Sequence, residues 1–162
     1  MLFKSLSIIT AATAALAAPI EVRDAPQQYV LQASIGPGAT GLKSLQLHGN
    51  QVVYGLTQGY SDFRAEDDGK IIKLFAQGYP ELSLDVAPDG ELTFQSPPKE
   101  KEGFSFTGEG NVQDFKFNGS REFYSCPDPV PGPLHPQNVY VKTGDKYACE
   151  DPVVFTIAAT KE

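Results

Sequence analysis

The sequence predicts an all-β, single-domain protein, on three observations. The chain has 162 residues, of which 15 are glycine and 13 are proline, and both residue types interrupt helices. Apolar and polar residues alternate with a period of two, which predicts about eleven to thirteen short antiparallel strands. Gly-containing turn dipeptides separate these runs at regular intervals. A β-sandwich, a barrel and a trefoil share this pattern, so the architecture stays open among them.

The N-terminal segment has the features of a secretory signal peptide. A positive charge at Lys4 precedes the uncharged run Ser5–Ala18, and Ala15-Leu16-Ala17 forms a small-x-small cleavage signature. The run is too short for the ~20 residues of a membrane-spanning helix, so no membrane association is expected. We therefore expect a signal peptide, a flexible polar lead and one β-rich domain: residues 1–17, 18–28 and 29–160.

Three hairpins are expected within the domain, each around an Asp-Gly or Asn-Gly turn. These dipeptides supply the positive φ that tight hairpin turns require. The alternation places Phe94 and Phe115 on apolar faces, and Ser83 and Lys116 on the opposite, wetter face. The expected hairpins span Phe63–Phe75, Leu82–Phe94 and Phe115–Tyr124.

Five prolines lie between Cys126 and Gln137. This density excludes a paired central strand and predicts a stiff surface loop. In a secreted chain, Cys126 and Cys149 are expected to form a structural disulfide. A metal site is not expected, because neither His48 nor His135 lies at ligand spacing from a cysteine.

The formal net charge of −7 argues against nucleic acid as a partner, because the protein would repel phosphate. The sequence has no nucleophile elbow, phosphate-binding glycine loop or zinc-protease motif. A ribonuclease would need His48 or His135 with Arg64 or Arg121, and the sequence indicates no such convergence. The acidic stretch 62–68 lacks calcium-loop spacing and is expected to be a solvated turn. We expect no catalytic residue and no cofactor.

Two binding features remain. Tyrosine rings offer an apolar face and a polar edge, as carbohydrate-binding surfaces require, and the candidate ligand contacts are Tyr60, Tyr79 and Tyr140. The tripeptide Asn118-Gly119-Ser120 is an acceptor for N-glycosylation at an expected hairpin tip.

The order of several motifs resembles a known family. The turn-containing run Leu82–Phe94 is followed by Gly103–Phe106, the step Phe123–Pro127, the strand Asn138–Val141 and Cys149 before a last apolar strand. Over residues 69–159 this order is similar to that of the fungal cell-wall protein PhiA and its secreted relatives. The resemblance implies a small secreted, β-rich protein of a filamentous fungus, found in the wall or culture fluid and linked with the development of spore-bearing cells. It implies no catalytic residues.

The leading hypothesis is therefore a non-enzymatic secreted or cell-wall protein that binds wall polysaccharide. The alternative is an apoplastic effector or elicitor that acts on a host, through a host protein, or on a competing microbe. A hydrolase is disfavoured, because no acid–base pair can be placed. The oligomeric state stays open.

Overall fold

The computed structural model describes residues 27–36, 41–57, 64–67, 72–75, 80–128, 130 and 135–162. These residues form an all-β structure, as the sequence predicts. They include no helix with the length and apolar character needed to cross a membrane. The strands are β1 (Gln27–Ser34), β2 (Leu42–Ser44), β3 (Gln46–His48), β4 (Gln51–Tyr54), β5 (Arg64–Asp67), β6 (Ile72–Phe75), β7 (Ser83–Val86), β8 (Leu92–Gln95), β9 (Phe104–Thr107), β10 (Val112–Phe117), β11 (Phe123–Ser125), β12 (Gln137–Asn138), β13 (Tyr140–Val141) and β14 (Val153–Lys161).

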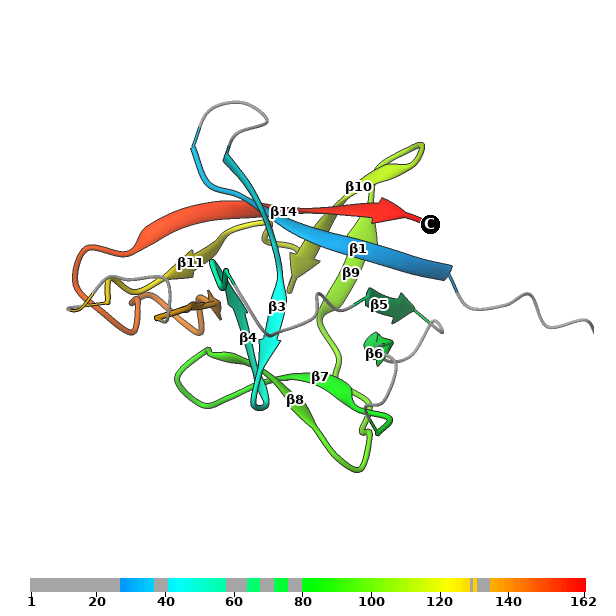
Figure 1. The fold of residues 1–162 in the computed structure, drawn as a ribbon, viewed down its shortest axis with the longest axis horizontal. Helices are drawn as coiled ribbons and strands as arrows, with labels where there is room; N and C mark the ends of the chain where they lie inside the picture. Colours follow the sequence, from blue (N-terminus) through cyan, green and yellow to red (C-terminus); the bar gives the residue numbers. More distant parts are fainter. Residues whose placement is uncertain are drawn as a thin grey trace, which may run out of the picture.

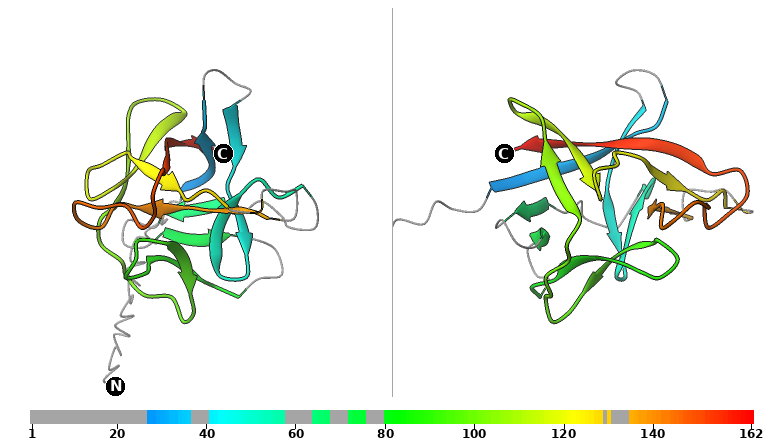
Figure 2. Two further views of the ribbon diagram at one scale, coloured as in Figure 1. Left: turned by 90° about the vertical axis from the view of Figure 1, so that its left-hand side faces the viewer. Right: turned by 180° about the vertical axis from the view of Figure 1, so that it is seen from behind.

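The strands join into one curled antiparallel sheet (Figure 1). Its main path runs β12-β4-β8-β7-β6-β5-β1-β14-β10-β9, and β2, β3, β11 and β13 pair beside this path. The first and last strands are neighbours, paired from Tyr29 with Lys161 to Ser34 with Thr156. Figures 1 and 2 show β14 lying along β1 across the molecule. β1 begins two residues before the expected start of the domain, because Gln27 and Gln28 pair with β5.

The segment from Gln137 to Val141 connects two distant parts of this sheet. β12 pairs with β4, and β13 pairs with β11, which in turn pairs with β14. Between them, the Val139 N–H donates to the carbonyl of Val52 at 3.0 Å, and the Val139 carbonyl accepts from the Leu92 N–H at 2.8 Å. The segment therefore fixes the position of β11 relative to the β4–β8 region.

The core follows the predicted alternation. Phe94 and Phe115 are buried, and the Phe115 ring stacks on Phe123 with centroids 5.5 Å apart. Lys116 is half-buried on the opposite face. The prediction for Ser83 is wrong: its side chain is fully buried, because the segment at Lys99 covers it and the Lys99 N–H donates to Ser83 Oγ at 2.8 Å.

Two of the three expected hairpins are present. β7 and β8 form the Leu82–Phe94 hairpin, and β5 pairs with β6 as the Phe63–Phe75 hairpin predicts for the described residues. The prediction of a Phe115–Tyr124 hairpin is correct at the turn and wrong for the strands on either side of it. Asn118 and Gly119 do form a tight turn with φ of 49° and 79°. After it β10 and β11 separate, because β14 is long enough to pair with both.

Candidate functional site

A hollow of about 290 Å³ lies where the proline-rich segment meets β12 and β13. We call it the Tyr140 pocket. It combines two features that the sequence singles out separately, the candidate ligand contact Tyr140 and the stiff segment that begins at Cys126. Its lining residues are Cys126, Asp128, Pro136, Gln137, Asn138 and Tyr140.

Tyr140 is held by the strand beside it. It pairs with Tyr124 across β13 and β11, and the two rings stack with centroids 5.4 Å apart and planes 22° apart. Burial raises the pKa of the Tyr140 hydroxyl above 10.0, and the negative charges of Glu91 and Asp89 raise it further, against a lowering hydrogen bond with Asn138. The hydroxyl therefore stays protonated at neutral pH and lies in a negative electrostatic environment.

Asn138 is oriented by a carboxylate from the neighbouring strand region. Glu91 Oε1 accepts hydrogen bonds from Asn138 Nδ2 and, at 2.9 Å, from Gln51 Nε2. Burial raises the pKa of the Glu91 carboxyl, the charge of Asp89 adds to this, and the two amide hydrogen bonds partly oppose it. This network fixes the amide of Asn138 beside the Tyr140 ring.

The lining also includes a charged group, Asp128. Asp128 is half-buried, and its Oδ1 accepts a hydrogen bond of 2.8 Å from the Val130 N–H, an Asx turn that fixes the side chain. Its second oxygen, Oδ2, lies 3.5 Å from Nδ1 of the exposed His135. The Val130 N–H thus holds one carboxylate oxygen, and among the described residues the other oxygen has a single contact, the long one with His135.

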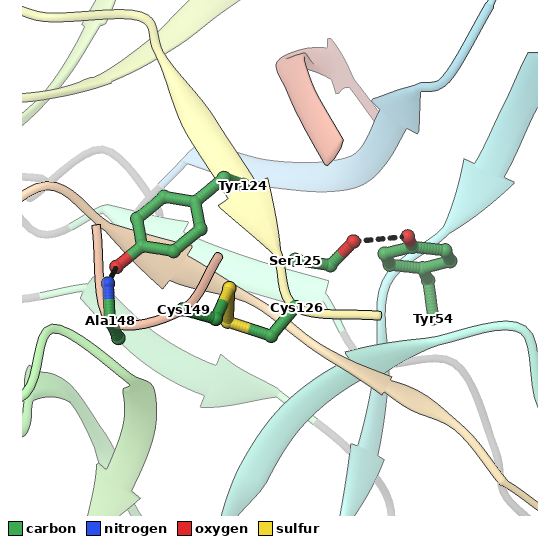
Figure 3. Close-up of a disulfide and its surroundings, with 6 residues drawn as sticks. All are labelled: Tyr54, Tyr124, Ser125, Cys126, Ala148 and Cys149. Atoms are coloured by element: carbon green, nitrogen blue, oxygen red, sulfur yellow. Dashed lines mark hydrogen bonds between the residues drawn. A yellow bond between two sulfur atoms is a disulfide. The ribbon is translucent and has the colours of Figure 1, made fainter. Parts of the chain in front are cut away.

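The predicted disulfide between Cys126 and Cys149 is confirmed (Figure 3). One of its two cysteines, Cys126, lines the pocket. Next to it, Tyr124 projects to the side of β11 opposite Ser125 and is only 1% exposed. The Tyr124 hydroxyl accepts a hydrogen bond from the Ala148 N–H. The Tyr147 ring packs edge-on against the Tyr124 ring, with centroids 4.9 Å apart. The disulfide therefore anchors a loop that covers the ring on which Tyr140 stacks.

The other side of β11 faces the core. Tyr54 Oη and Ser125 Oγ share a buried hydrogen bond of 2.7 Å (Figure 3). Burial raises the pKa of Tyr54, and the hydrogen bond with Ser125 partly opposes this. The side chains of β11 thus alternate. Ser125 bonds Tyr54 on the core side, and Tyr124 stacks on Tyr140 of the pocket on the other side.

Those of the remaining predicted site residues that the structure describes do not converge. Tyr60, Tyr79 and the acidic stretch 62–68, apart from the backbone of β5, lie outside the described residues, as does the side chain of Arg64. Arg121 lies 3.9 Å from Asp114, whereas His135 lies beside Asp128. His48 ends β3, where it pairs with Gln51. Asn118 is exposed at its turn.

No group of three or more histidine, cysteine or acidic side chains in the described part of the chain is placed to hold a metal ion. The described residues that line a second hollow, of about 310 Å³, include neither an aromatic ring nor a carboxylate. Among them the one buried polar side chain, Gln46, already bonds Leu56 through both amide atoms, at 3.1 and 2.8 Å. Its lining residues are Leu42, Lys43, Ser44, Gln46, Gly55, Leu56 and Thr57.

Sequence reasoning missed four residues of the site region, Glu91, Asp128, Gln137 and Asn138. Asn138 had a usable signal, because it lies two positions from Tyr140 and the alternation places both on one side of the chain. Glu91 had none, because 47 positions separate it from Asn138 and only the folded sheet brings them together.

Comparison of the chain with protein-family models, curated proteins and solved structures found no match. What the Tyr140 pocket can bind therefore follows from its lining. A tyrosine ring, two amides and a carboxylate around an open hollow suit a small ligand with apolar faces and many hydroxyl groups.

Proposed function

We propose that this protein is a non-enzymatic, secreted, cell-wall-associated protein that binds wall polysaccharide at the Tyr140 pocket. The observation that carries the proposal is that Tyr140, Gln137 and Asn138 line one hollow. A sugar ring presents an apolar face of C–H groups and a rim of hydroxyls. The tyrosine ring suits the face, and the amide and carboxylate groups suit the rim.

Rigidity of the pocket supports the same proposal. The Cys126–Cys149 bridge, the Asx turn at Asp128 and the Glu91 hydrogen bonds each fix one part of the lining before a ligand arrives. A preformed site loses little conformational entropy on binding. A site the size of a single sugar ring gains little energy from contact area, so this preorganisation matters.

Secretion is part of the proposal and draws on the N-terminal segment. The signal-peptide pattern of residues 1–17 and a structural disulfide both suit an oxidising, extracellular setting. The exposed turn at Asn118 suits an attached N-glycan. The resemblance to PhiA-like proteins adds a wall location in a filamentous fungus and a link with the development of spore-bearing cells.

The test measures retention on insoluble wall polysaccharides. We expect the purified protein to sediment with at least one of β-glucan, chitin and deacetylated chitin, and Tyr140→Ala to lower the affinity about tenfold, because the aromatic face is removed. Leu42→Ala is the matched control, since it shortens an apolar side chain in the second hollow. A protein that sediments with none of them would exclude polysaccharide binding and direct the search toward a host protein partner.

A further inference from the structure

We infer that the Tyr140 pocket selects a sugar unit with a free amino group, a hexosamine such as that of deacetylated chitin, over neutral and acidic sugars. This inference rests on the proposed function, because it names the class of saccharide for the same pocket. The structural reason is that a carboxylate lines the hollow, whereas the lining residues that the structure describes include no lysine or arginine.

Asp128 is the charged residue of that lining. Its Oδ1 is held by the Val130 N–H at 2.8 Å, which fixes the direction of the carboxylate without neutralising it. Within the described part of the chain, the one contact of its Oδ2 is with Nδ1 of His135, 3.5 Å away. An ammonium group carries three donors and forms charge-assisted hydrogen bonds with such an oxygen.

Other negatively charged groups lie near the pocket. The carboxyl of Glu91 accepts a hydrogen bond from Asn138, and the charge of Asp89 raises the pKa of both Glu91 and Tyr140. The protein as a whole carries a net charge of −7. An amino sugar is attracted by this field, and a uronate or phosphate is repelled.

Acetylation of the amino group would remove this advantage. An N-acetyl group is neutral, so it cannot form an ion pair with Asp128. It is also bulkier, in a hollow of about 290 Å³. We therefore expect a glucosamine oligomer to bind about tenfold more tightly than the N-acetylglucosamine oligomer of equal length.

The experiment titrates the full-length protein with four soluble probes: a glucosamine tetramer, an N-acetylglucosamine tetramer, a β-glucan tetramer and a galacturonate tetramer. Asp128→Asn keeps an oxygen that can accept from the Val130 N–H but removes the charge. We expect this variant to bind the two amino-sugar probes with equal affinity. Glu109→Gln, an exposed residue outside the pocket lining, removes the same charge and should keep the tenfold preference.

The outcomes separate this inference from the proposed function. Binding of neutral and amino sugars with equal affinity, lost in Tyr140→Ala, would overturn the amino-sugar preference and leave polysaccharide binding intact. An equal loss of preference in Asp128→Asn and Glu109→Gln would also overturn it, since the attraction would then come from overall charge. Binding of none of the probes would overturn both.

Discussion

The hydroxyl of Tyr124 accepts a hydrogen bond of 2.9 Å from the backbone N–H of Ala148, the residue before Cys149. The hydrogen bond and the disulfide therefore hold the same loop against the same face of β11. Because Tyr140 stacks on Tyr124, this contact also supports the pocket.

Reduction of the disulfide should release this loop. A bridge between residues 23 positions apart stabilises a fold by roughly 3 kcal/mol in the chain-entropy model, so reduction should lower the free energy of unfolding by about that amount. Hydrogen exchange is the measurement. The Ala148 amide should lose protection first, while amides in β1 and β14 stay protected. Unchanged protection at Ala148 would show that packing alone holds the loop.

Glu91 should make stability depend on pH. Its pKa is raised above 4.5 in the folded protein, so the folded state holds this proton more tightly than the unfolded state. The raised pKa of Glu91 therefore adds to the free energy of unfolding. This contribution is complete below pH 4.5 and is lost as the pH rises through the pKa of the folded state. Glu91→Gln removes the titration and keeps an oxygen for the amide donors of Gln51 and Asn138.

Urea denaturation of both proteins between pH 4 and 7 tests this prediction. Relative to the wild type, the Glu91→Gln variant should become more stable as the pH rises. A stability difference that does not change with pH would contradict the assignment of the shift to Glu91.

The buried pair Tyr54 and Ser125 should be coupled. Ser125→Ala leaves the Tyr54 hydroxyl buried without its 2.7 Å partner, which costs about 1–3 kcal/mol. Tyr54→Phe leaves the Ser125 hydroxyl in the same position. The double variant should be destabilised by about 1 kcal/mol less than the sum of the two single variants, measured by a double-mutant cycle. Additive effects would mean that the hydrogen bond contributes nothing.

Phe115 should be a major contributor to stability. Its side chain is fully buried and stacks on Phe104 and Phe123. Phe115→Ala should therefore lower the free energy of unfolding by about 3–5 kcal/mol in urea denaturation. Val112→Ala, in the same strand but 58% exposed, should change it by less than ~0.5 kcal/mol. Similar effects of the two substitutions would contradict this description of the core.

The sequence predicted what depends on local pattern. Period-two alternation identified the strands around Phe94 and Phe115, and Asp89-Gly90 correctly placed the β7–β8 turn. The disulfide followed from two cysteines in a chain expected to be secreted. Ser83 was misassigned because alternation describes one sheet and takes no account of a segment that crosses its outer face, as Lys99 does.

The parts of the fold that the sequence did not predict depend on pairing between strands distant in sequence. A good Asn-Gly turn at Asn118 predicted that β10 and β11 pair with each other, but both pair with β14, whose partner residues lie 28 to 48 positions away. The pocket was only half predicted for the same reason. Tyr140 was chosen from its chemistry, whereas Asn138 and Glu91 meet beside the isolated bridge that pairs Glu91 with Tyr140, between segments distant in sequence.

The most direct test of the account is the affinity of the wild type, Tyr140→Ala and Tyr140→Phe for the polysaccharide that the wild type retains best. Polysaccharide binding at the Tyr140 pocket predicts about tenfold weaker binding for Tyr140→Ala and near-normal binding for Tyr140→Phe, which keeps the ring. Leu42→Ala should bind like the wild type. Equal binding by Tyr140→Ala and the wild type, with near-ultraviolet circular dichroism showing both to be folded, would contradict the account.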